Sequence, residues 1–224
     1  MGNTVLGRIL DVGLVPVVRV SSTQDAVLVA EAIQAGGVSI LEVTMTVPRA
    51  LQVIEKVAGC LGDQVVLGAG TVLDVETARS ASLSGAEFIV TPCVKPAVIE
   101  VCKRYSKTII LGAMTPTEVL TAWEAGADLV KVFPCDSLGG AKYLKALKAP
   151  LPQIRVVPTG GVSLDMVDDL IAAGASALGV GSELVDNQSL MAGNFTQITE
   201  NAKRFLRAIK LARQPMTQCP TTTG

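Results

Sequence analysis

The chain has 224 residues, of which 49% are hydrophobic, 17% charged and 3% aromatic, with a formal net charge of −1. This composition supplies a large aliphatic core and excludes a disordered chain, and the scattered Lys and Arg residues lack the clustering of a nucleic-acid-binding surface. Histidine is absent from the sequence, which excludes Ser-His-Asp and Cys-His catalysis and imidazole-ligated metal sites. We therefore expect no nucleic-acid partner, no metal and no cofactor.

The first residues predict neither a secretion signal nor a membrane span. No basic segment precedes an apolar stretch, and the longest apolar run near the start, at 14–18, is too short to cross a bilayer. The five cysteines are dispersed without a C-x-x-C pair, so we interpret them as reduced thiols, most of them small core residues. The sequence thus predicts a cytoplasmic protein with no membrane partner.

Taken in chain order, short apolar runs alternate with amphipathic segments. A first helix is expected at about 4–11, before the first apolar run. The runs are almost continuously apolar, as is typical of parallel strands covered on both faces. Eight strands are predicted, at 14–20, 39–45, 65–71, 88–92, 108–114, 129–134, 155–160 and 177–182. The clearest helical periodicity lies at 23–35 and 163–173.

Glycines punctuate this repeat at the same place in successive units. Gly36, Gly85, Gly126 and Gly174 each follow a helical segment and precede a strand. Eight strands alternating with helices predict an α/β fold, a single-domain (β/α)₈ TIM barrel with an extra N-terminal helix. An open doubly wound sheet is the alternative, but its G-x-G-x-x-G turn is missing. We expect the barrel to cover residues 1–213 and the polar tail 214–224 to be disordered.

Two charged residues interrupt predicted barrel strands. Lys131 lies within 129–134, where burial disfavours the charged form, and attack on a ketone requires a neutral amine. Glu42 lies within 39–45, where burial raises the pKa of a carboxyl and suits it to proton transfer near neutral pH. Each has a structural alternative, namely a lysine whose ammonium reaches water or a glutamate held in an ion pair. Together they favour one shared interior site.

Further polar or glycine-rich positions fall where other predicted strands end, which is where barrels of this kind place their active sites. Arg19 ends the first strand and suits capture of a carboxylate or phosphate, or a salt bridge to Glu42. Thr71 ends the third strand and offers a hydroxyl. The segments 158–162 and 179–182 have glycines leading toward helices, and such loops leave backbone N–H groups free to bind an anion.

Five motifs resemble those of the 2-keto-3-deoxy-6-phosphogluconate (KDPG) / 4-hydroxy-2-oxoglutarate (KHG) aldolases. In order they are LEVT (41–44), GAGTV (68–72), KVFP (131–134), PTGGV (158–162) and GVGS (179–182). The resemblance runs from about residue 14 to residue 185. It implies a class I, metal-independent lyase that cleaves KDPG to pyruvate and glyceraldehyde 3-phosphate, or KHG to pyruvate and glyoxylate. It also implies a homotrimer.

The same resemblance implies roles for individual residues. Lys131 matches the Schiff-base lysine of the family, Glu42 its general acid/base, and Thr71 a residue that contacts bound pyruvate. The other matching positions are Pro92 and Phe133 as pocket walls, Thr159 as a residue that influences stereochemistry, and Gly160, Gly161, Gly181 and Ser182 at the phosphate-binding end.

One position departs from the pattern. Many members carry an arginine where this chain has Thr46, whereas a second group has that threonine together with an arginine at the end of the first strand. This chain resembles the second group, so Arg19 is assigned to the substrate carboxylate.

Three alternatives stay open at this point. The sister aldolase for 2-keto-3-deoxy-6-phosphogalactonate also carries the strand-1 arginine, although its seventh strand usually lacks the Pro158-Thr159 pair. A sugar-phosphate isomerase or epimerase on the same barrel would need the phosphate loops and Glu42 but not Lys131. A binding or scaffold protein without activity would need none of these charged residues.

Overall fold

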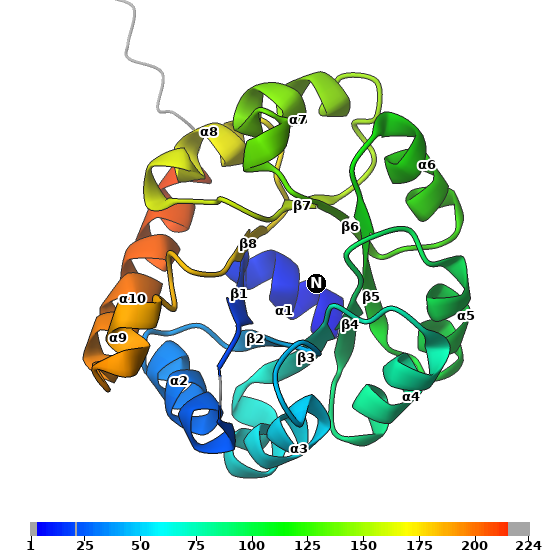
Figure 1. Ribbon diagram of the computed structural model, residues 1–224. Helices are drawn as coiled ribbons and strands as arrows, with labels where there is room; N and C mark the ends of the chain where they lie inside the picture. Colours follow the sequence, from blue (N-terminus) through cyan, green and yellow to red (C-terminus); the bar gives the residue numbers. More distant parts are fainter. Residues whose placement is uncertain (1–3, 21, 215–224) are drawn as a thin grey trace, which may run out of the picture.

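The computed structural model of the protein describes residues 4–20 and 22–214. In Figure 1 the strands form a barrel and the helices lie around it. The strands are β1 Leu14–Val18, β2 Ile40–Thr44, β3 Val66–Gly70, β4 Phe88–Val90, β5 Thr108–Ala113, β6 Leu129–Val132, β7 Val156–Pro158 and β8 Leu178–Val180. The helices are α1 Val5–Val12, α2 Thr23–Ala35, α3 Ala50–Leu61, α4 Val75–Leu83, α5 Pro96–Arg104, α6 Pro116–Glu124, α7 Gly140–Lys148, α8 Val167–Ala172, α9 Asn187–Met191 and α10 Phe195–Ala212.

The sheet is parallel throughout and nearly closed. Its order is β7-β6-β5-β4-β3-β2-β1-β8, and the seam between β7 and β8 is joined by the isolated parallel bridges Val156↔Ala175 and Thr159↔Gly179. The predicted (β/α)₈ barrel is therefore confirmed. Each observed strand lies within its predicted range and ends one or two residues earlier, where the chain passes into the loop that follows the strand.

The helices follow the sequence pattern with one exception. The helix expected at 23–35 is α2, and the expected N-terminal helix is α1, where the Thr4 hydroxyl accepts a hydrogen bond from Gly7 N at 3.1 Å. The helix expected at 163–173 is instead a 3₁₀ turn, Leu164–Met166, followed by the short α8. The domain boundary at residue 213 stays a prediction, because residues 215–224 of the tail lie outside the described residues.

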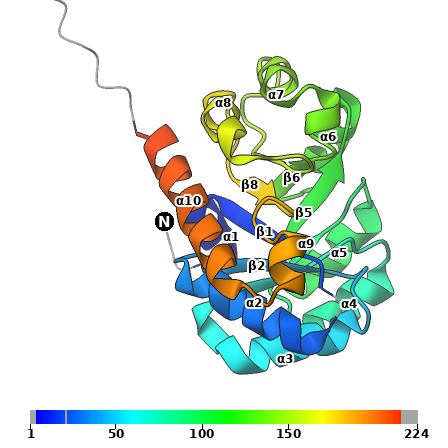
Figure 2. The ribbon, with the colours of Figure 1, turned by 60° about the vertical axis from the view of Figure 1, so that its left-hand side comes forward.

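Alternate residues of the strands face the barrel interior. These side chains form one buried cluster with Ile9 of α1, and they are Val15, Ile40, Val66, Phe88, Val90, Ile110, Leu129, Val157 and Ala177. The Phe88 ring occupies the space that a side chain at Gly68 would fill, so it lies across the lower interior. Figures 1 and 2 show α1 across the end of the barrel opposite to α9. The barrel is thus closed at the end that α1 covers.

The outer faces of the strands pack against the helices, and α10 ties the last part of the chain to the first. Arg213 donates hydrogen bonds to Asp11 O at 3.0 Å and to Ser176 O at 2.8 Å. Gly13 leaves room for this guanidinium, since a Cβ there would collide with it.

Among the described residues, no helix is both long enough and apolar enough to cross a membrane.

The cysteines divide into two kinds. Cys102 and Cys135 are buried, and burial raises the pKa of each thiol to about 11. Cys60 and Cys93 are exposed, so the expectation of mainly core cysteines is wrong for these two, which lie on the solvent side of α3 and in the loop after β4. Cys219 lies outside the described residues.

Candidate active site

Lys131 and Glu42 both face the barrel interior. Lys131 follows the interior residue Leu129 by two positions, and Glu42 follows Ile40 by two, so the alternation of strand side chains directs both inward. Their exposed fractions are only 5% and 2%. They are the two charged residues that are buried in the described part of the chain. A lysine ammonium reaching water, the structural alternative for Lys131, is therefore excluded.

The Glu42 carboxyl lies against β3. A side chain at Gly70 would collide with it, so the glycine makes the room that the carboxyl occupies. Its Oε1 atom is buried and has no hydrogen-bond partner. Burial raises the pKa of Glu42, while the positive charges of Lys131 and Arg19 act to lower it. This carboxyl is suited to hold a proton and to exchange it with a molecule in the barrel mouth.

The Lys131 amine lies over an aromatic ring. Its Nζ is 5.0 Å from the centroid of the Phe133 ring. On the other side, Lys131 pairs in register with Gly112 of β5, and the backbone of Pro92 fills the space beside that glycine. No salt bridge joins Lys131 to Glu42 within the described ranges. Among the described residues, the amine is therefore placed by its contact with the Phe133 ring and not by a salt bridge.

A small cavity of about 120 Å³ lies at the ends of β1, β7 and β8. Its lining includes most of the residues predicted to bind substrate or phosphate, namely Arg19, Phe133, Thr159, Gly160, Gly161, Gly181 and Ser182. The structure thus brings together residues that lie far apart in the sequence. Gly160 and Gly161 have φ angles of 89° and 73°, a backbone conformation that glycine adopts without strain.

Thr159 and Thr71 hold two further positions of the mouth. Thr159 is buried, its hydroxyl donates to Val157 O at 3.3 Å, and a side chain at Gly179 would collide with it. Thr71 directly follows Gly70, beside which the Glu42 carboxyl lies, and has a φ of 57°. A β-branched residue in this left-handed conformation costs about 1–3 kcal/mol. Such strain is common at functional sites and places Thr71 among the candidates for substrate contact.

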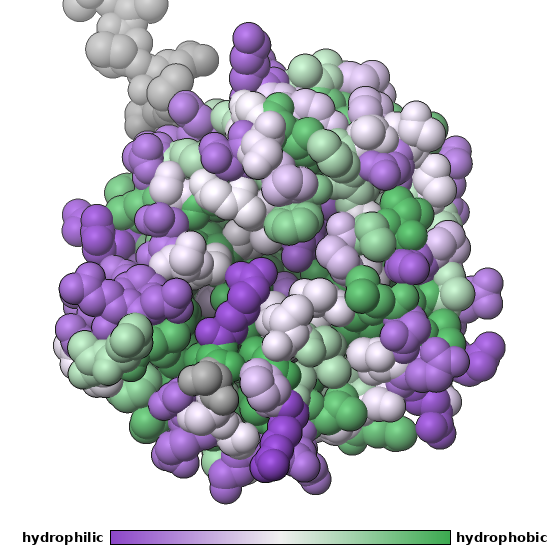
Figure 3. Space-filling model, viewed as in Figure 1, coloured by the Kyte–Doolittle hydropathy of each residue, from purple (hydrophilic) through white to green (hydrophobic). Residues whose placement is uncertain are grey.

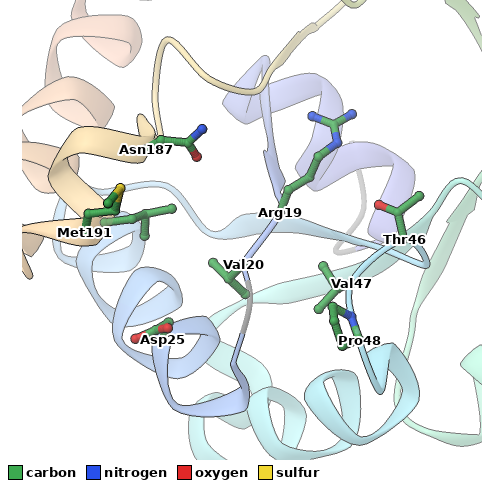
Figure 4. A pocket seen from close by; sticks show the side chains of 9 residues that line it. Arg19, Val20, Asp25, Thr46, Val47, Pro48, Asn187 and Met191 are labelled. Carbon is green, nitrogen blue, oxygen red and sulfur yellow. The ribbon is translucent and has the colours of Figure 1, made fainter.

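Arg19 stands one residue beyond β1 and is exposed at the mouth. It also borders a larger cavity of about 590 Å³, lined by residues of the β1–α2 and β2–α3 loops and of α9. Figure 4 shows the guanidinium reaching away from Val20, Val47 and Pro48 of that cavity. Figure 3 views the same end of the molecule, where hydrophilic and hydrophobic side chains lie close together around the mouth. The alternative of a salt bridge between Arg19 and Glu42 is not what the structure shows for these two described residues.

Residues 7–201 match the family described as KDPG and KHG aldolase. The chain is 36% identical to a 2-dehydro-3-deoxy-phosphogluconate aldolase of Treponema pallidum, over 92% of this chain and 98% of the relative. It is 34% identical to a 2-dehydro-3-deoxy-6-phosphogalactonate aldolase of Escherichia coli, over 90% and 96%. The chain belongs to the KDPG and KHG aldolase family. The predicted family and aldolase class are thereby confirmed.

The fold agrees with solved structures of the family. A KDPG aldolase of Legionella pneumophila, with pyruvate captured at low pH as a covalent carbinolamine intermediate, superposes with a TM-score of 0.83. The two chains are 28% identical, and the match covers 90% of this chain and 98% of that chain. A carbinolamine requires an amine that attacks a ketone, and Lys131 is the one lysine buried in the described interior of this family member.

Sequence reasoning missed several residues of this aldolase site. Glu183 lines the small cavity, and Asp136 lies against Gly161, with Oδ2 3.1 Å from where a Cβ would be. Thr44 was also missed, and its hydroxyl lies 2.8 Å from that of Thr46, the position at which the sequence departs from the family pattern. Alternation along β2 could have placed Thr44 inside the barrel, but no pattern pairs Asp136 with Gly161. Among the described residues, no group of three or more His, Cys, Asp or Glu residues is arranged to hold a metal ion.

Proposed function

We propose that this protein is a class I aldolase that cleaves KDPG to pyruvate and glyceraldehyde 3-phosphate, and KHG to pyruvate and glyoxylate. Lys131 forms the Schiff base and Glu42 transfers the protons. Thr71 contacts the pyruvate half, Pro92 and Phe133 form the walls, and Thr159 faces the carbon whose configuration is set. The glycine-rich ends of β7 and β8, at 160–161 and 181–182, hold the distal phosphate.

In the first half of the reaction the Lys131 amine attacks the C2 ketone. The resulting carbinolamine takes up a proton on its oxygen and loses water, which leaves a protonated imine. The buried Glu42 carboxyl gives and takes the protons of these steps, since its raised pKa allows it to be protonated before the step and ionised after it.

In the second half the C3–C4 bond breaks. Glu42 removes the proton of the C4 hydroxyl, the C4–O bond becomes a carbonyl, and the bonding electrons pass to the imine to give an enamine. The aldehyde leaves, C3 of the enamine takes up a proton, and water releases pyruvate from Lys131. The imine cation accepts the electrons throughout, so the residues of the chain supply the chemistry that the cleavage requires.

The observation that carries the proposal is the burial of one lysine and one glutamate in the same barrel interior. Burying two charged groups is costly, and a Glu42 oxygen without a hydrogen-bond partner adds to that cost. A purely structural ion pair would satisfy both groups, yet no such pair joins these described residues. The arrangement is explained if a substrate provides the missing partners.

The proposal is tested by trapping. Incubation of the protein with pyruvate and borohydride is expected to add one reduced pyruvate to the intact mass, and peptide mapping is expected to place it on Lys131. Lys131→Met keeps an apolar side chain of similar length and is expected to abolish both trapping and cleavage. Lys142→Ala, an exposed position on α7, is the matched control and is expected to behave as the parent protein.

Labelling that persists in Lys131→Met would contradict the assignment of the amine. A parent protein that is never labelled, but that interconverts sugar phosphates, would instead support an isomerase or epimerase. An inactive scaffold would show neither reaction.

The sister aldolase for 2-keto-3-deoxy-6-phosphogalactonate is the second candidate. Arg19 at the end of β1 and the 34% identity to the Escherichia coli enzyme favour it. The Pro158-Thr159 pair favours the gluconate substrate, because the seventh strand of the sister aldolase usually lacks this pair. The two functions are separated by comparing kcat/KM for the two C4 epimers, and we expect the gluconate epimer to react faster.

Two further expectations belong to this proposal. We propose a homotrimer that acts in the cytoplasm on small-molecule 2-keto acids. Light scattering of the eluting protein measures the oligomeric state directly, and a monomer or dimer would overturn that part of the proposal without affecting the chemistry.

A further inference from the structure

The position of Arg19 relative to the two ends of a substrate decides which anionic group it binds. Its Nη1 atom is 3.3 Å from where a Cβ on Gly181 would be, so the guanidinium lies against the end of β8. It therefore reaches toward the small cavity that Gly160, Gly161 and Ser182 also line. Thr71 and Pro92, the candidates for the pyruvate end, do not line that cavity.

The charges around the small cavity make this position significant. Arg19 is the one cation among the described residues that line it, and Glu183 is the one anion. Outside the lining, the Asp136 carboxylate lies against Gly161. A phosphate dianion bound by the backbone N–H groups of the glycine loops would therefore lie near two carboxylates, those of Glu183 and Asp136. Like charges that border one cavity oppose binding unless a cation offsets them.

We propose that Arg19 binds the distal phosphate of the substrate rather than the carboxylate beside the reacting ketone, and that Glu183 opposes it. This inference rests on the proposed function and changes the assignment expected from the sequence. A guanidinium matches the planar arrangement of two phosphate oxygens and binds them with charge-assisted hydrogen bonds. Arg19 thereby sets the preference for phosphorylated over unphosphorylated substrates, and Glu183 weakens that preference.

The test separates the two ends of the substrate. The pyruvate concentration that gives half-maximal borohydride trapping reports the keto-acid end alone. The KM for KDPG and inhibition by inorganic phosphate report the distal end. For Arg19→Ala we expect KM for KDPG to rise about 10- to 100-fold, the inhibition by phosphate to weaken in parallel, and half-maximal trapping by pyruvate to change less than about twofold.

A second variant, which removes a negative charge instead of a positive one, controls for nonspecific disruption of the site. Glu183→Gln removes the anion, so we expect KM for KDPG to fall about two- to fivefold. Arg19→Lys keeps the charge and is expected to recover part of the affinity for phosphate. Arg155→Ala, an exposed arginine just before β7 at the opposite end of the strand, is the matched control and is expected to leave all three readouts unchanged.

Two results would overturn the inference. One is a pyruvate half-saturation that rises in Arg19→Ala as much as KM for KDPG, which would assign Arg19 to the carboxylate. The other is unchanged phosphate inhibition in both Arg19→Ala and Glu183→Gln. The proposed function fails separately, because in that case the parent protein itself would not be trapped by pyruvate.

Discussion

Glu42 illustrates how one buried carboxyl trades stability for function. Its pKa is raised in the folded state from a usual value of 4.5, chiefly by burial. The folded protein therefore keeps a proton that the unfolded chain releases. It follows that stability falls as the pH rises from about 4.5 through the pKa of the folded state, and the penalty persists at higher pH.

We predict that Glu42→Gln, which resembles a permanently protonated glutamate, is more stable than the parent protein at pH 7. For a chain of this size Tm rises by about 2–4 °C for each kcal/mol gained. Calorimetry across the pH range measures the effect, and melts at pH 4 provide the control, because the difference should then vanish. The same variant should lower kcat by about 10²- to 10⁴-fold. A variant that is less stable at pH 7 would show that ionised Glu42 stabilises the barrel.

At the scale of elements, α6 shows how a loop at the barrel mouth is fixed. The Thr115 hydroxyl accepts from Glu118 N at 3.3 Å, and Glu118 Oε2 accepts from Met114 N at 2.7 Å and Thr115 N at 2.8 Å. These hydrogen bonds hold the pKa of Glu118 below its usual value. Their stabilising effect is therefore present above pH 4.5 and is lost as the pH falls through the pKa of the folded state.

We predict that Thr115→Ala lowers the free energy of unfolding by about 1 kcal/mol, as is usual for loss of an N-cap. Glu118→Gln should also be less stable than the parent protein at pH 7, and this deficit should shrink in acid. Urea unfolding at both pH values measures the two effects. Thr117→Ala, an exposed neighbour whose side-chain atoms accept no cap hydrogen bond, is the control. A Glu118→Gln deficit that is independent of pH would contradict this account.

The elements themselves were largely predictable, because their patterns are local. All eight strands and α2 follow from apolar runs, helical periodicity and glycine punctuation. The prediction of one helix at 163–173 was wrong in part, because its first turn is a 3₁₀ helix. Periodicity does not distinguish such a turn from an α-helix. Lys131 and Glu42 could be singled out because a charge within an apolar strand is rare. Glu183 and the side to which Arg19 turns could not, because they depend on how loops from opposite ends of the chain meet at the barrel mouth.

At the scale of the whole molecule, the barrel is held unevenly. β2 and β3 pair over five residues, from Ile40↔Val66 to Thr44↔Gly70, whereas β7 and β8 meet through two isolated bridges. Arg213 reinforces that seam from below through its hydrogen bond to Ser176 O. Local opening of a structure is easiest where few hydrogen bonds must break.

We predict that backbone amides at 156–159 and 178–180 exchange with solvent faster than those at 40–44 and 66–70. Hydrogen exchange followed by mass spectrometry measures this contrast. In Arg213→Ala, exchange at 175–180 should accelerate further while 40–44 stays unchanged. Equal protection around the whole barrel, or no local effect of Arg213→Ala, would show that the helices rather than the strand pairs hold the seam.

The closed end of the barrel has a consequence for the order of events. Phe88 and α1 close the end of the barrel opposite to the candidate active site. A substrate and both of its fragments must therefore enter and leave through the same open end. In the proposed reaction, the fragment joined to Lys131 is the deeper one, and the other fragment lies nearer the small cavity and the surface. The aldehyde must therefore leave before water can reach the imine and release pyruvate from Lys131. In the direction of synthesis, the single opening requires the keto acid to bind first and the aldehyde to bind second.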